Sequence, residues 1–113
     1  MELFTIPKKI NPTKQTEYSF KIPLNIYQTW ENNKVPKGMY EAIHTWINLN
    51  PEYTYNLYDS QDRLNYVINF NCSDFSFNNE ELLYCYNNMA QNAAKADIWR
   101  YLILYNQGGV YTD

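Results

Sequence analysis

The chain has 113 residues, of which 45% are hydrophobic and 19% charged, and its formal net charge is −3. These values fit one globular domain, and the scattered basic residues argue against a nucleic-acid partner, which usually meets a basic face. Two cysteines and one histidine supply neither a disulfide framework nor the usual ligands of a zinc site. No signal peptide or membrane-spanning stretch is visible, so a cytoplasmic location is the default expectation.

The first half of the chain predicts an arm, a strand and a helix. Residues 1–21 mix Pro, Lys and Thr without periodicity, which indicates an extended or loosely docked arm. The segment IPLNIYQTW, residues 22–30, has the β-branched and aromatic content of a buried strand. ENNKVPKG follows as a turn. In MYEAIHTWINL, residues 39–49, apolar side chains recur at helical spacing.

The second half predicts a strand, three helices and a last short strand. YTYNLYD reads as the strand, and Asp59 or Ser60 is expected to cap a helix that runs to about Phe70. The buried stripe of that helix is predicted to be Leu64, Val67 and Ile68. NCSDFSFNNE reads as a loop, EELLYCYNNM as a short helix and AAKADIWRYLILYNQ as a longer one. Gly108 and Gly109 are expected to form a left-handed C-cap before the strand VYT.

Strands that alternate with helices indicate an α/β fold with a parallel, Rossmann-like sheet. In such sheets ligands bind beyond the carboxyl ends of the strands. This rule selects three places in the chain: Gln28 to Trp30, Asp59 with Ser60, and Asp113. We expect residues 22–113 to form one domain behind the arm of residues 1–21.

The last helix carries two charges on an apolar background. On a helical wheel the centre of its apolar face is Ala94, Ile98, Tyr101, Leu102 and Tyr105. The helix is apolar nearly all round and is expected to be largely buried. Asp97 and Arg100 lie about 60° apart at the edge of that face. One interpretation is an exposed ion pair worth about 0.2–0.5 kcal/mol. The other is a buried pair met by a sugar, whose hydroxyls donate to the carboxylate and accept from the guanidinium.

The pattern Asp97-x-x-Arg100, followed by Gly108-Gly109-x-Tyr111-x-Asp113, resembles the signature of glycosyltransferase family 32, the sugar-transferase region with a DXD motif. IPLNIYQTW looks like the family's opening strand, with Tyr27 where the family usually has His. NPEYTYNLYD resembles its second strand segment. The three blocks stand in the family's order and cover residues 22–113.

The resemblance implies a GT-A fold, here its nucleotide-sugar-binding half with a parallel sheet flanked by helices. It also implies a UDP- or GDP-hexose donor, a divalent metal (commonly Mn²⁺) and mannosyltransferase-like transfer with retention. The acceptor, whether glycan, lipid or protein, stays open. By the same resemblance, the donor sugar would be held by Asp97, Arg100 and Asp113, with Asp113 also a metal ligand. The nucleotide pocket would be lined by Gln28, Thr29, Trp30 and, as a weaker candidate, Asp59.

The sequence stops at Asp113, the first Asp of the DXD motif, so we expect a fold truncated after its third strand and an incomplete metal site. An incomplete metal site predicts that the chain lacks robust transferase activity. The shortened sheet predicts exposed, adhesive side chains at Trp99 or Ile103. An alternative function is therefore a catalytically inactive relic, or an interaction module that a second polypeptide completes.

Overall fold

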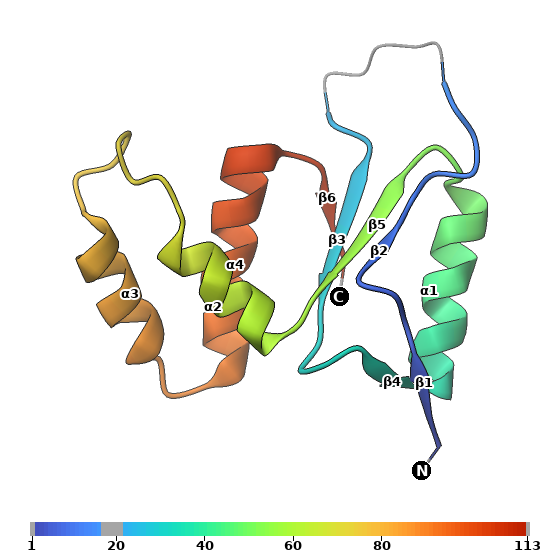
Figure 1. The fold of residues 1–113 in the computed structure, drawn as a ribbon, viewed down its shortest axis with the longest axis horizontal. Coiled ribbons are helices and arrows are strands. Elements are labelled where there is room, and N and C mark those ends of the chain that lie inside the picture. Colours follow the sequence, from blue (N-terminus) through green and yellow to red (C-terminus); the bar gives the residue numbers. More distant parts are fainter. Residues whose placement is uncertain (1, 17–21, 113) are drawn as a thin grey trace.

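In the computed structural model, which describes residues 2–16 and 22–112, a mostly parallel sheet forms the centre of the fold (Figure 1). Its strands, in spatial order, are Lys9–Ile10 (β2), Thr54–Tyr58 (β5), Asn25–Thr29 (β3) and Val110–Tyr111 (β6). β3 pairs in parallel with β5 and with β6, whereas β2 runs antiparallel to β5. The mixed α/β fold with a parallel sheet is confirmed, and the antiparallel edge strand is an addition.

Helices cover both faces of this sheet, because successive side chains of a strand point to opposite faces. Ile26 of β3 packs in a core with Ile43 of helix α1 (Lys37–Leu49). Its neighbour Tyr27 packs with Trp99 and Ile103 of helix α4 (Asn92–Gln107). Figure 1 shows α1 on one side of the sheet and α4 with α2 (Ser60–Ile68) on the other. Helix α3 (Asn79–Asn87) packs on α2 and α4, farthest from the strands.

Local sequence fixes the start of two helices. The Asp59 carboxylate accepts from the backbone N–H of Asp62, whose own carboxylate accepts from the backbone N–H of Asp59. Asn78 and Glu81 form the same reciprocal capping box at the start of α3. Each box satisfies two backbone donors that a helix start leaves unpaired. The expected cap at Asp59 is confirmed.

The Gly-Gly turn after α4 differs in detail from the predicted left-handed cap. Gly108 has φ 69° and ψ −174°, so its φ is positive but its ψ lies outside the left-handed helical region. Gly109 has φ 109°, and a Cβ at this position would lie 2.8 Å from the carbonyl oxygen of Asn25. The turn therefore needs glycine both for its backbone angles and for its close approach to β3.

The N-terminal segment is more ordered than the predicted loose arm. Leu3–Thr5 (β1) pairs with Lys34–Pro36 (β4), which the sequence assigned to a turn, and β2 joins the main sheet. Ile6, between β1 and β2, is fully buried in the core beside α1. The sequence predicted an extended or loosely docked arm and missed these pairings, because strands of two or three residues are too short to show a period. Residues 17–21 of the predicted arm lie outside the described residues.

Two helices bury a different face from the predicted one. In α2, Val67 is buried as expected, but Ile68 is 45% exposed and Arg63 is only 2% exposed. In α4 the buried side chains are Trp99, Leu102 and Ile103, whereas Tyr101 and Tyr105 are exposed. A helix that is apolar all round does not reveal its inner face, and tyrosine tolerates water through its hydroxyl.

The expected exposure of Trp99 and Ile103 was also wrong, since both are fully buried. The indole of Trp99 lies 5.0 Å from the ring of Tyr58 and 6.1 Å from the ring of Tyr111, measured between centroids. The two residues of β6 are therefore enough to cover it. Within the described ranges no helix has the length and apolar character needed to cross a membrane.

Candidate functional site

The carboxyl ends of β3, β5 and β6 meet along one edge of the sheet, because the three strands are parallel. Helix α4 runs back across the sheet, so its N-terminal half lies beside this edge (Figure 1). Trp99 makes the connection, since its ring contacts the last residue of β5, Tyr58, and the last residue of β6, Tyr111. Among the described residues, the edge therefore brings together two of the places that the sequence selected as ligand-binding, Gln28 to Trp30 and Asp59 with Ser60.

Asp97 and Arg100 form the predicted pair at this edge, with Nη2 of Arg100 3.4 Å from Oδ1 of Asp97. The guanidinium of Arg100 also lies over the ring of Tyr111, 5.2 Å from its centroid, and over that of Tyr101 at 5.0 Å. Of the two interpretations, the buried pair is wrong: the Asp97 side chain is 60% exposed and that of Arg100 is 28% exposed. The contact with Tyr111 nevertheless keeps Arg100 at the end of β6, with its charge accessible from solvent.

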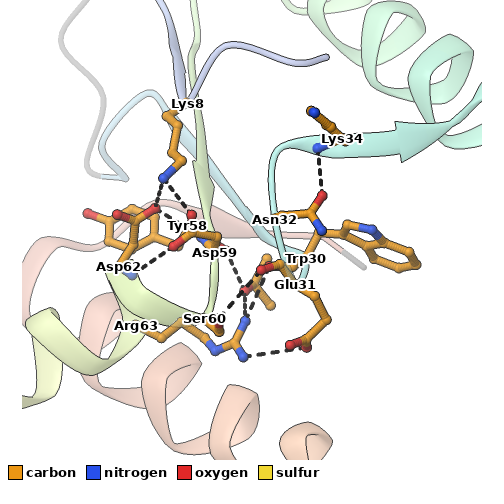
Figure 2. Close-up of polar contacts among 11 residues, drawn as sticks. Lys8, Trp30, Glu31, Asn32, Lys34, Tyr58, Asp59, Ser60, Asp62 and Arg63 are labelled. Atoms are coloured by element: carbon orange, nitrogen blue, oxygen red, sulfur yellow. Dashed lines mark hydrogen bonds and ion pairs between the residues drawn. The ribbon is translucent and has the colours of Figure 1, made fainter. Parts of the chain in front are cut away.

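The three residues at the end of β3 that were predicted to line the nucleotide pocket have side chains that point in different directions. Gln28 is buried, and its Oε1 accepts a hydrogen bond from the hydroxyl of Tyr55 at 2.5 Å. Burial raises the pKa of Tyr55 far above its ordinary value, so this phenol stays a donor. Thr29 points to the opposite face, where its hydroxyl donates to the carbonyl of Tyr58 at 2.6 Å. Trp30 is 41% exposed, and Figure 2 shows its indole directed away from the neighbouring ion pairs.

The carboxylate of Asp59, which follows β5, already has hydrogen-bond partners within the protein. Besides capping α2, it accepts from Nζ of Lys8 at 2.6 Å, and the same ammonium lies 2.8 Å from Asp62 (Figure 2). Burial raises the pKa of Asp59, but the hydrogen bonds from Lys8 and Asp62 outweigh it, and the pKa lies below its ordinary value. Lys8 is a residue that the sequence prediction missed, since it stands 51 positions away from Asp59 in the chain.

Arg63 is a second charged residue that was missed. Its side chain is 2% exposed, and its Nη1 donates to the hydroxyl of Thr29 at 2.5 Å and to the carbonyl of Trp30 at 3.5 Å. Nη2 lies 3.6 Å from the carboxylate of Glu31 (Figure 2). The guanidinium thus ties α2 to the loop that carries Trp30. A signal was available, because Arg63 precedes the buried Val67 by four residues and so lies on the same helix face.

The pairing of β6 with β3 continues beyond the last residue of β6, in the direction of Asp113 in the sequence. The backbone N–H of Thr112 donates to the carbonyl of Tyr27 at 3.0 Å, so pairing with β3 extends past Tyr111. Asp113, predicted as a ligand of both the sugar and a metal, lies outside the described residues. Among residues 2–16 and 22–112, no three Asp, Glu, His or Cys side chains lie together in a way that fits a metal ion. The described residues alone therefore do not fit the implied metal.

Comparison with known proteins finds similar sequences among fungal mannosyltransferases. The chain is 30% identical over 112 residues to inositol phosphoceramide mannosyltransferase 3 of Schizosaccharomyces pombe, covering 99% of this chain and 29% of that protein. It is 33% identical over 92 residues to inositol phosphoceramide mannosyltransferase 2 of the same yeast, covering 81% and 24%. To the initiation-specific alpha-1,6-mannosyltransferase of Candida albicans it is 30% identical over 128 residues, covering 97% and 30%. The chain spans less than a third of the length of these relatives.

No solved structure matches the chain significantly. The family assignment rests instead on the model described as the glycosyltransferase sugar-binding region containing the DXD motif, which matches residues 36–113. That range holds Asp59, Asp97 and Arg100, together with the Gly-Gly turn that leads into β6 from its amino end. The chain belongs to the glycosyltransferase family defined by this sugar-binding region.

Proposed function

We propose that this chain carries the donor-binding part of a retaining, nucleotide-sugar-dependent hexosyltransferase with a GT-A fold. The family membership and the mannosyltransferases among its relatives support a hexose donor. The observation that carries the proposal is the Asp97–Arg100 pair, which lies beside the end of β6 with both charges open to solvent.

The pair suits a sugar because its two members have opposite hydrogen-bonding character. The carboxylate of Asp97 only accepts, and the guanidinium of Arg100 only donates, so together they engage both functions of neighbouring hydroxyls. Tyr101 and Tyr111 hold the guanidinium between their rings, which limits the orientations it can adopt. Since the side chains are already solvated, a ligand reaches them without breaking a buried ion pair.

For the nucleotide, Trp30 offers an exposed ring face suited to stacking on a base. Arg63 holds the backbone of Trp30 in place, through its hydrogen bonds to the Thr29 hydroxyl and to the Trp30 carbonyl. Gln28 and Asp59 are engaged by Tyr55 and Lys8, so in this proposal they shape the edge of the nucleotide site.

The implied divalent metal, Mn²⁺ in the proposal, would neutralise charge on the diphosphate when bound. Of the chain's residues we assign it only Asp113. In the proposed reaction the bond from the anomeric carbon to the diphosphate breaks, and an acceptor hydroxyl bonds to that carbon with its proton leaving to the departing phosphate. The part of this chain in that reaction is to bind and orient the sugar through Asp97 and Arg100.

Isothermal titration of the purified chain with GDP-mannose and UDP-glucose tests the donor site. Asp97→Asn and Arg100→Ala should each weaken binding of the preferred donor about tenfold or more, because a hydrogen bond to a charged group contributes about 1.5–3 kcal/mol. The matched control is the Lys37–Glu41 pair on α1, whose members are four residues apart on one helix and more exposed. Glu41→Gln should leave the affinity unchanged. Unaltered affinity in both site variants would remove the donor assignment.

A further inference from the structure

A hollow separate from the proposed donor site lies on the face of the sheet that carries α2, between this helix and strands β5 and β2. Its volume is about 560 Å³, within the range of small-ligand sites. None of the residues proposed for the donor lines it. Five of its wall residues share a side-chain amide: Asn56, Asn65, Asn69, Asn71 and Asn106.

Three of these amides, those of Asn65, Asn69 and Asn106, keep hydrogen-bonding capacity for a ligand. The NH₂ group of Asn56 is already directed at acceptors of β3 and β5, and the Asn71 oxygen accepts from the backbone N–H of Ser73. The Asn69 amide donates to the backbone carbonyl of Asn65 at 2.9 Å, and the Asn106 amide donates to the hydroxyl of Tyr66 at 3.0 Å. Each of these bonds uses one hydrogen and leaves the amide oxygen free among the described residues. The NH₂ group of Asn65 likewise has no partner there. Amides that both donate and accept match hydroxyl groups, which do the same.

The charge of the walls favours a neutral ligand over an anion. Lys8 lines one end of the hollow, but its ammonium is held by Asp59 at 2.6 Å and by Asp62 at 2.8 Å. Lys9 is the other basic wall residue, and its exposed side chain keeps the ammonium in water. A phosphate group would therefore find one neutralised cation and one hydrated cation, and no guanidinium among the wall residues.

Aromatic rings complete the walls. Tyr66 lies between Tyr58 and Phe70, with ring centroids 6.1 and 6.2 Å away. Burial, and to a smaller extent the neighbouring Tyr27, raises the pKa of Tyr58 to about 12. Burial also raises the pKa of Tyr66. Both phenols stay protonated at neutral pH and present an apolar body with a polar tip. Such rings accommodate the C–H face of a sugar while the amides reach its hydroxyls.

We propose that this hollow binds one neutral cyclic polyol through its asparagine amides and the ring of Tyr66. Two sources share this chemistry: a hexose unit of a glycan and the inositol ring of a headgroup. That the bound ring belongs to the acceptor of a transfer reaction rests on the proposed function. Binding of the ring itself does not.

Side-chain amide NMR signals of the ¹⁵N-labelled chain test the proposal, with methyl α-mannoside and myo-inositol titrated separately. At least one polyol should shift the Asn65, Asn69 and Asn106 amide signals in a saturable way. Asn65→Ala and Asn69→Ala should each weaken this binding about three- to tenfold, the effect of losing one hydrogen bond. Asn48→Ala is the matched control, because Asn48 is an exposed helical asparagine on the opposite side of the sheet and should change nothing.

Saturation by the mannoside alone assigns the hollow to a glycan, by inositol alone to a headgroup, and by both to the shared ring chemistry. Absence of saturable shifts, equal affinity in Asn65→Ala, or tighter binding of inorganic phosphate than of either polyol would overturn the proposal. The donor site is judged separately: Asp97→Asn should leave polyol binding unchanged. Failure at one site therefore does not count as failure at the other.

Discussion

Replacing Lys8 by Met removes the ammonium that joins the N-terminal segment to the start of α2. In the native chain this group lies 2.6 Å from Asp59 and 2.8 Å from Asp62. Met keeps a long unbranched stem, so the substitution removes the charge and changes the packing little. The change therefore isolates the electrostatic part of the docking of β2.

The exposure of the three side chains limits the expected magnitude. Lys8 is 43% exposed, Asp62 33% and Asp59 18%. Exposed ion pairs contribute about 0–1 kcal/mol each, and a partly buried hydrogen bond between charged groups contributes more. We expect Lys8→Met to lower the free energy of unfolding by about 1–2 kcal/mol at pH 7. Lys37→Met, which breaks an exposed pair with Glu41 at 3.9 Å, should cost less than about 0.5 kcal/mol.

The pH dependence gives this prediction a sign. The pKa of Asp59 is lowered below its ordinary value of 3.8, so its contribution is present above that pH and is lost as the pH falls through the folded pKa. The pKa of Lys8 is raised above 10.5 by its hydrogen bonds to Asp59 and Asp62. Its contribution is therefore present below pH 10.5 and is lost as the pH rises through the folded value. The stability difference between wild type and Lys8→Met should be flat from about pH 5 to 10 and shrink outside that window.

Urea denaturation of both proteins across this pH range measures the difference, and Asp59→Asn completes a double-mutant cycle. Asn retains N-cap function, so the cycle reports mainly on the ion pair. The reasoning is refuted if Lys8→Met costs no more than Lys37→Met, or if the difference between wild type and Lys8→Met keeps its full size at a pH low enough to protonate Asp59 in the folded wild type. Either result would mean that β2 docks without help from this cluster.

Other substitutions test the core, the turn and the nucleotide site. Trp99→Ala should lower the free energy of unfolding by about 3–5 kcal/mol in urea, because this fully buried indole fills the space between Tyr58 and α4. Gly109→Ala should cost about 1–3 kcal/mol in the same assay, since it combines φ 109° with a Cβ at 2.8 Å from a carbonyl oxygen. Gly38→Ala, with open space in α1, should raise stability by about 0.5–1 kcal/mol. Trp30→Ala should reduce UDP or GDP affinity by calorimetry and leave the melting temperature within about 3 °C of wild type, because its side chain is 41% exposed.

Local signals in the sequence were enough to predict the layered α/β fold. The hydrophobic spacing of α1, the β-forming residues of β3 and β5, and the cap at Asp59 all act over a few residues. Strands β1, β2 and β4 were missed because they have two or three residues each and gain their pairing from distant parts of the chain. No local pattern predicts such pairing.

The candidate site was predictable in part for the same reason. Helical spacing alone places Asp97 next to Arg100, and the structure has them in contact. The sequence left open whether the pair is exposed or buried, because α4 is apolar nearly all round and its inner face is chosen by the packing of Trp99 on Tyr58 and Tyr111. The roles of Arg63 and Lys8 depend on partners in other elements, which a reading of one segment at a time does not reach.

The donor assignment is tested most directly by measuring how much the sugar adds to nucleotide affinity, in wild type and in Asp97→Asn. Calorimetry with GDP against GDP-mannose, and with UDP against UDP-glucose, gives this increment for each pair. We predict that wild type binds one nucleotide sugar more tightly than its nucleotide. In Asp97→Asn this gain should disappear while the affinity for the nucleotide alone stays unchanged. An increment of the same size in Asp97→Asn, or an equal loss for nucleotide and nucleotide sugar, would contradict a role for this carboxylate in holding the sugar.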